Sequence, residues 1–341
     1  MNNMFHKELY IDNRTREGFS KSRISWLDTL KGIDIILVVL FHVFHNDFAN
    51  NAIYAIAMPL FFFTAGYVYR ERPILIDIQR RIETILRPYF VFGTICLIYW
   101  IFIESRFRQS DMTVPQAIIG LFRAQNTWLD FNVHLWFLPC FFVMVVLFNI
   151  LVKMLGINFA YGFSIILLIL YLIIPMPDLP WGLNRVCKFI VFYMLGNIAR
   201  RKISPEVNKN KPNSIVLVSI GIALLTVVAF LAQVSPQGSL SWYFIATVGI
   251  IGCVLLSVCF DCRLLEYLGQ ASIVILCFHG PIYRVLIKIE SVLLNLSTEA
   301  VRENFVLVSI VIIITLLACS AIYQIVLKFF PWVIGREAAE R

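Results

Sequence analysis

Charged side chains are scarce in this chain of 341 residues. They make up 15% of the sequence, against roughly 25% in soluble globular domains, while apolar residues reach 60%. Mean hydropathy is +0.80, so the composition excludes an ordinary soluble domain and predicts an all-α integral membrane protein. Several motifs are also missing. Without a Walker loop, a dinucleotide fingerprint or a Gly-x-Ser-x-Gly elbow, neither nucleotide-dependent nor serine-nucleophile chemistry has sequence support.

The N-terminal region lacks the apolar core of a cleaved signal peptide. Residues 1–25 mix both signs of charge, so we expect the first span to insert uncleaved. The eight cysteines lie mostly within apolar runs. Cys259 and Cys262 have CxxC spacing, but a second ligand pair is missing, so small packing residues are the favoured interpretation. The sequence predicts no metal site.

The apolar residues cluster in ten runs, which we interpret as membrane spans because a helix needs about 20 mainly apolar residues to cross a bilayer. The runs lie at approximately 33–48, 52–69, 88–104, 135–154, 159–175, 186–199, 214–233, 241–260, 266–287 and 304–327. The predicted fold is therefore a bundle of about ten transmembrane helices in a single domain, residues 26–330. Residues 1–25 are predicted to be an N-terminal arm and residues 331–341 a C-terminal tail.

Basic residues are distributed unevenly between the loops, and the net charge is +8. With the N-terminus placed in the cytoplasm, 21 of the 29 lysines and arginines fall on cytoplasmic segments. The positive-inside rule then predicts that both termini are cytoplasmic and that residues 105–133 and 288–303 lie outside. This asymmetry accounts for the basic excess as a topology signal that also contacts anionic membrane lipid, so nucleic acid is not an expected partner.

The first apolar run carries its ionisable side chains on one face. At about 100° per residue, six positions fall within about 120° of one another around a helix. These positions are Asp28, Lys31, Asp34, Val38, His42 and His45. Lipid offers ionisable groups no partner, so this face is predicted to point into the protein and to be functional. Lys31 would lie near the cytoplasmic interface, with His42 about 16 Å further along, near mid-membrane.

This stretch resembles the opening helix of a known family. Trp26-Leu-Asp-Thr-Leu-Lys31-Gly-Ile33, followed by an apolar run to His42, is similar to the start of the membrane-bound acyltransferase-3 family. Its members include bacterial O-acetyltransferases of surface polysaccharides, and the Lys-Gly pair resembles the fucose-acetylase-like branch. Members carry a basic residue, ten intervening residues and then histidine. Lys31 and His42 match this spacing, although many members have arginine at the first position.

Three later elements resemble motifs of the same family, in the family's order. Arg80-Arg81, with Arg87-Pro88 after it, resembles the basic segment before the third span. His134-Leu-Trp136-Phe-Leu-Pro139 resembles the family's Leu-Trp-Phe-Leu element. Leu268–Pro281 resembles an element that ends in histidine, here His279. The resemblance therefore extends over most of the chain.

The resemblance implies that His42, Lys31 and Asp28 are catalytic. Histidine suits the removal of a hydroxyl proton because its unperturbed pKa lies near neutrality. Lys31 would hold a phosphate of coenzyme A or polarise the thioester. Asp28 or Asp34 would orient the His42 ring and keep it usable as a base.

The remaining candidates are assigned to donor and acceptor binding. Arginines near the cytoplasmic face suit the phosphates of acyl-CoA, although they satisfy the positive-inside rule equally well. These donor-binding candidates are Arg80, Arg81 and Arg87. The acceptor or supporting candidates are Asp34, His45, His134, Trp136 and His279. Trp136 would stack on a sugar ring or anchor the helix at the interface, and His279 would be functional or merely a hydrogen-bonded structural residue.

The implied function is transfer of an acetyl (acyl) group from cytoplasmic acetyl-CoA to a hydroxyl of a cell-surface or lipid-linked sugar, by a multi-pass protein of the inner cell membrane. No tightly bound cofactor is expected, and the sequence does not indicate the oligomeric state. A secondary transporter that uses intramembrane His and Asp as a proton relay is the main alternative. However, the inverted repeats and paired broken helices common in transporters are not visible. A structural or sensory membrane protein is a second alternative.

Overall fold

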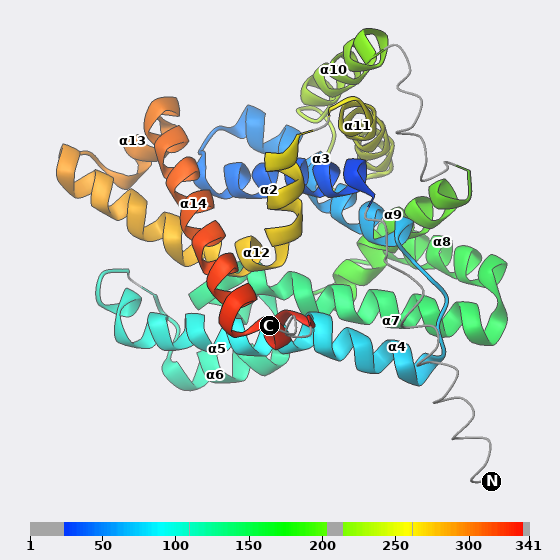
Figure 1. Cartoon of the computed structure of the whole chain (residues 1–341), viewed down its shortest axis with the longest axis horizontal. Helices are drawn as coiled ribbons and strands as arrows, with labels where there is room; N and C mark the ends of the chain where they lie inside the picture. Colours follow the sequence, from blue (N-terminus) through cyan, green and yellow to red (C-terminus); the bar gives the residue numbers. More distant parts are fainter. Residues whose placement is uncertain (1–23, 109, 203–213, 261, 337–341) are drawn as a thin grey trace.

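The computed structural model describes residues 24–108, 110–202, 214–260 and 262–336. All regular structure in these residues is helical, as the composition predicts (Figure 1). The longer helices are α2 Ser25–Val43, α3 Asp47–Tyr67, α5 Arg87–Phe102, α7 Phe137–Leu155, α8 Ile157–Ile173, α9 Leu183–Lys202, α10 Ser214–Leu231, α11 Leu240–Cys259, α12 Arg263–Leu294 and α14 Phe305–Phe329. Shorter ones are α4 Ile74–Arg81, α6 Val114–Arg123 and α13 Thr298–Glu303, the π-helix η1 Ile82–Leu86, and the 3₁₀-helices η2 Glu104–Arg106, η3 Asn126–Trp128, η4 Asp130–Trp136, η5 Pro180–Gly182 and η7 Pro331–Ile334.

Within the described residues, six helical segments are long and apolar enough to cross a membrane. They are Asp47–Tyr67, Ile74–Arg106, Asp130–Leu155, Leu240–Cys259, Arg263–Leu294 and Phe305–Phe329. Each of the ten predicted runs lies on a helix, but α8 and the apolar part of α10 are short, and α2 and α9 carry several charges. The helical, membrane-spanning class is therefore established, while the number of ten spans and the side of the termini stay predictions.

The central helices approach one another closely through glycine. A Cβ at Gly32 of α2 would overlap the carbonyl of Leu265 on α12, and a Cβ at Gly269 of α12 would overlap the carbonyl of Asp28. Gly66 of α3 and Gly196 of α9 form a similar reciprocal crossing. Small residues are what membrane helices use for such close packing, because lipid supplies little hydrophobic drive between helices. The α2–α12 crossing brings together two of the segments that carry histidines.

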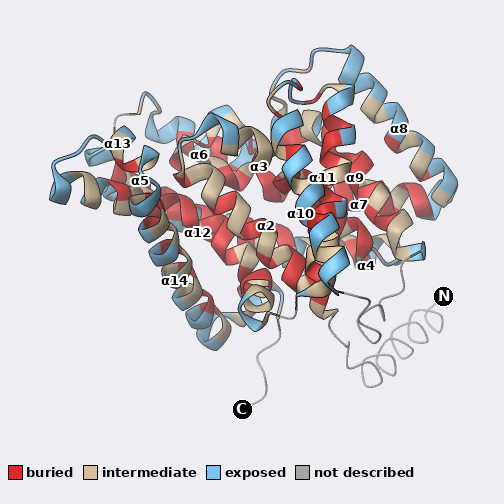
Figure 2. Ribbon diagram, turned by 90° about the horizontal axis from the view of Figure 1, so that it is seen from above, coloured by how far each residue is buried: buried red, intermediate tan, exposed pale blue. Residues whose placement is uncertain are grey.

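The buried residues form one core that runs through α2, α3, α7, α9 and α12, while exposed apolar side chains cover the peripheral helices (Figure 2). Only 22% of the apolar window of α14 is buried inside the protein. Exposed side chains on this helix include Phe305 and Leu317. Because a water-exposed surface of this kind would be unfavourable, these faces are suited to lipid.

The first helix ends earlier than the sequence predicts. α2 stops at Val43 and Phe44 is extended, so the expected helical face that continues to His45 is wrong. The side chain of Asn46 accepts a hydrogen bond from the Ala49 backbone and caps α3, which forces the chain out of α2 first. Arg302 of α13 then donates to the carbonyls of His42 and Val43 at the free end of α2.

Other element ends differ from the expected spans. α12 continues seven residues beyond the predicted end at residue 287, to Leu294. The start of the expected C-terminal tail packs on the bundle: Val333 is buried, and the Trp332 carbonyl accepts a hydrogen bond from Arg87. Residues 1–23 of the expected N-terminal arm lie outside the described residues.

Candidate active site

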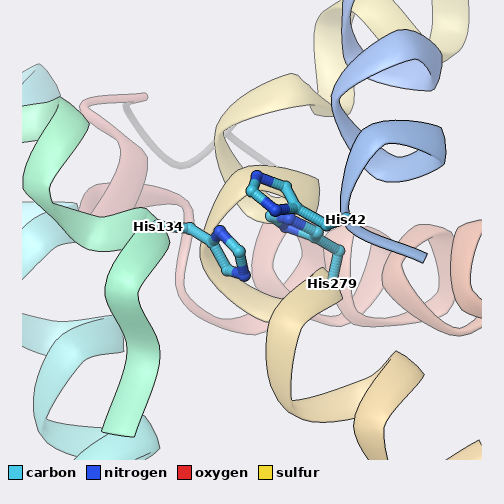
Figure 3. Close-up of side chains that lie close together, drawn as sticks. All are labelled: His42, His134 and His279. Atoms are coloured by element: carbon cyan, nitrogen blue, oxygen red, sulfur yellow. The ribbon is translucent and has the colours of Figure 1, made fainter. Parts of the chain in front are cut away.

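Three histidines that are far apart in the sequence meet in the interior. His42 comes from the last turn of α2, His134 from η4 and His279 from the middle of α12 (Figure 3). The ring centroid of His134 lies 4.0 Å from that of His42 and 4.3 Å from that of His279, and the His42–His279 separation is 5.5 Å. His134 and His279 are buried, whereas His42 is half-buried and borders a cavity. We refer to these residues as the histidine cluster.

The backbone of α12 sets the orientation of His279. Its Nδ1 lies 2.8 Å from the carbonyl oxygen of Ile275 and 3.0 Å from that of Leu276. A carbonyl only accepts hydrogen bonds, so this contact assigns the proton to Nδ1 and leaves a lone pair on Nε2. Among the described residues, neither Nε2 of His279 nor Nε2 of His134 has a hydrogen-bond partner, although both atoms are buried. The cluster therefore holds two buried ring nitrogens without a partner, and the one on His279 has a lone pair that a ligand or proton can satisfy.

Pro281 explains how the His134 segment is attached to α12. Proline has no N–H, so the helical hydrogen bond that would reach the carbonyl of Cys277 is missing. The side chain of Asn132 donates to this carbonyl instead, at 2.7 Å. Gly280 leaves the space for the next contact, since a Cβ there would lie 2.6 Å from Cδ2 of His134. A Gly-Pro pair inside α12 thus positions the histidine of η4 beside that of α12.

A buried ion-pair network supports the same junction. Glu104 is fully buried and accepts two hydrogen bonds from Arg284 of α12, at 2.7 and 3.1 Å. Arg108 lies 2.8 Å from the same carboxylate. Arg284 also donates to the carbonyl of Phe131 in η4, at 2.9 Å. Removing either partner of such a buried pair leaves an uncompensated charge, so the network ties η2, η4 and α12 into one unit.

A cavity of about 220 Å³ opens beside the histidine cluster. His42 and His134 line it together with Tyr54, Trp136 and Arg185. The guanidinium of Arg185 lies 4.5 Å from the centroid of the Trp136 ring and pairs with Asp178 at 2.6 Å. The hydroxyl of Tyr54 accepts a hydrogen bond from Lys188, which is buried. We call this space the histidine cavity. Its wall combines aliphatic and aromatic side chains with a single arginine, Arg185.

A second cavity of about 510 Å³ lies near the N-terminal end of α2. Its lining includes the basic residues Lys31, Arg70, Arg72, Arg80, Arg81 and Arg336, and a single acidic residue, Asp28. Lys31 pairs with Asp28 at 3.6 Å, and Arg81 pairs with the buried Asp77 at 3.3 Å. The remaining excess of positive charge suits a polyanion, because arginine binds phosphate through charge-assisted hydrogen bonds. We call this space the basic cavity.

The two cavities approach each other at a narrow partition. Phe137 and Leu276 line both of them. Phe61 belongs to the basic cavity, and its ring centroid lies 4.7 Å from that of Phe137 in an edge-to-face contact. Lys31 and His42 stand on opposite sides of this partition, about 16 Å apart along α2 at 1.5 Å per residue.

The candidate residues from the sequence divide into separate places. Three of them line the histidine cavity: His42, His134 and Trp136. His279 lies behind these residues, in ring contact with His42. Four others line the basic cavity: Asp28, Lys31, Arg80 and Arg81. The remaining three candidates, Asp34, His45 and Arg87, line neither cavity.

Each of these three has a different environment. Asp34 is fully buried in α2, with no hydrogen-bond partner for its carboxylate among the described residues. His45 is exposed beyond the end of α2, and partial burial followed by the charge of Arg302 lowers its pKa. Arg87 pairs with Glu83 at 3.6 Å and donates to the carbonyl of Trp332.

Several residues at the cavities were not among the candidates. Tyr54 lies in an apolar run and Arg185 directly precedes one, neither within a recognisable motif, and only the fold brings them to Trp136. Arg336 of the basic cavity comes from the C-terminal tail. The three histidines themselves are 92 and 145 positions apart in the chain, so no local pattern indicates that they meet.

The chain was also compared with known proteins. A family model described as an acyltransferase domain, of the acyltransferase-3 type, matches residues 24–324. The match begins just before α2 and ends within α14, so it covers the histidine cluster, the histidine cavity and all of the basic cavity's lining except Arg336. No curated protein and no solved structure matches the chain.

Proposed function

The chain belongs to the acyltransferase-3 family and is a membrane acyltransferase, and we propose that it transfers an acetyl group from cytoplasmic acetyl-CoA to a hydroxyl of a cell-surface or lipid-linked sugar. The observation that carries this proposal is the pairing of a basic cavity with a histidine cavity across one thin partition. A donor that carries phosphates needs a basic site, whereas an acceptor hydroxyl needs a base to remove its proton. The partition brings the two within reach of one another.

The basic cavity is the proposed donor site. Acetyl-CoA carries several phosphates at the end remote from its thioester, and the arginines of α4 and the preceding loop would hold them. Lys31 would bind a further phosphate, because it lies in the basic cavity about 16 Å along α2 from His42, too far to reach a thioester carbonyl placed there. The lining turns apolar towards Phe61, Phe137 and Phe141, which suits the thioester end of the donor better than its phosphates. The narrow partition favours a short acyl group.

The histidine cavity is the proposed acceptor site and the place of the chemistry. His42 takes the proton from the acceptor hydroxyl as its oxygen attacks the thioester carbonyl. The new C–O ester bond forms, the C–S bond breaks, and the thiolate of coenzyme A leaves. The proton that His42 took from the hydroxyl then passes to the thiolate, which restores the neutral base. The rings of His134 and His279 pack against the His42 ring, with centroids at 4.0 and 5.5 Å, and the free lone pair of His279 would stabilise the positive charge that His42 acquires.

The other residues that line the histidine cavity suit a carbohydrate. Trp136 and Tyr54 present aromatic rings, and Arg185 and Asn126 provide polar groups for hydroxyls. Arg185 lies over one face of the Trp136 ring, so a sugar would contact Trp136 through its other face or its edge. We place the enzyme in the inner cell membrane as a multi-pass protein. In this location the basic cavity would face the cytoplasm, where acetyl-CoA is found, and the histidine cavity would face outwards.

The direct test is the rate of acetyl transfer by a His42→Ala variant. As the general base, His42 is expected to contribute about 10²–10⁴ in rate, so transfer from labelled acetyl-CoA in membranes should fall by at least about 100-fold. His45→Ala is the matched control, because His45 lies three residues further on and outside the cluster. It should keep nearly normal activity. Rates are normalised to the amount of folded protein.

Lys31 tests the donor side of the same proposal. Lys31→Arg keeps the positive charge and should retain substantial transfer, whereas Lys31→Ala should lose it. Near-normal transfer by a folded His42→Ala variant would contradict the proposed chemistry and shift the role of base to His279.

A further inference from the structure

We propose that the histidine cluster is also a binding site for one transition-metal dication of the zinc class, and that occupancy of this site switches off acyl transfer. The inference rests on the function proposed above, because it concerns the same histidine lone pairs. It adds a ligand and a means of regulation, which the transfer chemistry alone does not require.

The geometry of the cluster is close to that of a three-histidine metal site. His42, His134 and His279 each offer a ring nitrogen, and these three atoms lie within 4.8 Å of one another. Zinc binds imidazole at about 2.0–2.1 Å in a tetrahedral arrangement, which separates ligand nitrogens by about 3.3–3.4 Å. Small changes in side-chain torsion would close the widest pair. Three protein ligands would leave the fourth position open.

The hydrogen bonds of His279 prepare one ring nitrogen of the cluster for a metal. Metal-bound histidines usually donate their other ring N–H to a carbonyl or carboxylate, which fixes the tautomer. His279 meets this condition through Nδ1 and the carbonyls of Ile275 and Leu276. The Nε2 atoms of His134 and His279 are buried and have no hydrogen-bond partner among the described residues. A cation bound there would satisfy the lone pair that the His279 tautomer leaves on its Nε2.

The ligand type decides which ion is suitable. Imidazole nitrogen suits zinc, copper, nickel and iron, whereas magnesium and calcium require oxygen ligands. The cluster offers three imidazoles and no carboxylate, so it should distinguish the two groups of ions. His42 and His134 border the histidine cavity, which gives an ion an approach route.

Two nearby arginines oppose a dication, but both are occupied. The positive charge of Arg284 is compensated by the bidentate pair with Glu104. The guanidinium of Arg302 is held on the carbonyls at the end of α2. Their electrostatic effect reaches His42 and should weaken metal binding, yet neither side chain takes a ring nitrogen as its partner.

Metal binding and catalysis exclude each other because both require the same nitrogen lone pair of His42. The base must have a free nitrogen lone pair to accept the hydroxyl proton, and the metal binds that lone pair on His42. A bound ion would also fill the end of a cavity of about 220 Å³ where the acceptor hydroxyl must lie. Zinc outside the cell would therefore inhibit the enzyme reversibly.

The binding test uses the full-length protein, purified in detergent and stripped with a chelator. Bound zinc per chain is measured by elemental analysis after titration and desalting, and cobalt is titrated in parallel because its visible absorption reports a tetrahedral site. One ion per chain is expected. His134→Ala and His279→Ala should each weaken affinity by at least about tenfold, since even outer-shell changes cost 10–100-fold. His45→Ala is the control that should bind normally.

The regulatory test measures acetyl transfer in permeabilised membranes. Zinc should inhibit with the same midpoint as binding, a chelator should restore the rate, and magnesium should have no effect. Absence of binding, or binding that the two histidine variants leave unchanged, would overturn the metal site while the result for His42→Ala still stands. Stoichiometric binding without inhibition would overturn the exclusion, and would also remove His42 as the base. Loss of activity on chelation alone would reverse the assigned role of the metal.

Discussion

Gly280 controls where the ring of His134 can lie. A Cβ at this position would come within 2.6 Å of Cδ2 and 2.9 Å of Nε2 of His134, closer than real side-chain contacts allow. The His134 ring would have to move, since Gly280 lies on the backbone of a buried helix. The position of one histidine in the cluster therefore depends on the absence of a methyl group on another element.

We expect Gly280→Ala to reduce acetyl transfer by about tenfold or more while the protein remains folded, because a mutation that shifts the groups of a site by about 1 Å can cost 100-fold. Alanine itself favours helix over glycine, so helix α12 should tolerate the change. Transfer rates per folded protein are the measurement. Gly162→Ala in α8 is the matched control, since a Cβ there meets nothing within 4 Å. Equal activity of the two variants would contradict this role of Gly280.

At the scale of elements, the π-helix η1 separates two arginines that an ordinary helix would align. Arg80 and Arg87 are seven residues apart, and residues at this spacing fall only about 20° apart around an uninterrupted α-helix. The wider turn of Ile82–Leu86 rotates the chain between them. Arg80 therefore lines the basic cavity, whereas Arg87 contacts Glu83 and Trp332.

This difference predicts separate effects on donor binding. Arg80→Gln should raise the KM for acetyl-CoA by roughly tenfold, as expected for the loss of one hydrogen bond to a charged group, and change kcat less. Arg87→Gln should leave this KM unchanged. Arg81 is best removed together with Asp77, because Asp77 is buried and would otherwise lose its charged partner. A similar rise in KM for Arg87→Gln would show that the donor phosphates lie outside the basic cavity.

At the scale of the whole molecule, the two cavities lie towards opposite ends of α2, so the proposed function requires a defined orientation in the membrane. The asymmetry of 21 basic residues among 29 predicts that the basic cavity faces the cytoplasm, where acetyl-CoA is found. Residues 105–133, which contain α6, should then face outwards.

Cysteine labelling in intact cells tests this orientation. An impermeant thiol reagent should modify Asp111→Cys, which is exposed, and should spare Asn208→Cys in the predicted cytoplasmic loop 200–212. Position 208 lies outside the described residues. The unsubstituted chain sets the background from its native cysteines, five of which are buried. The opposite labelling pattern would place the donor site on the side without acetyl-CoA and rule out the proposed direction of transfer.

Local sequence determined a large part of this protein. Apolar runs predicted the helical membrane class, because a backbone in lipid must satisfy its own hydrogen bonds. The spacing of Lys31 and His42 predicted that they share α2, since helical periodicity depends only on neighbouring residues. The end of α2 was also readable in principle, because Asn46 and Asp47 are typical of a helix start.

The tertiary structure alone decided which residues act together. The meeting of His42 with His134 and His279 depends on contacts between distant elements: the glycine crossing of α2 and α12, the bond from Asn132 to Cys277, and the pair of Arg284 with Glu104. Such contacts leave no periodic signal, because each joins segments whose separation along the chain is arbitrary. For the same reason, Asp34 and His45 looked equivalent to His42 on a helical projection, although neither joins the histidine cluster.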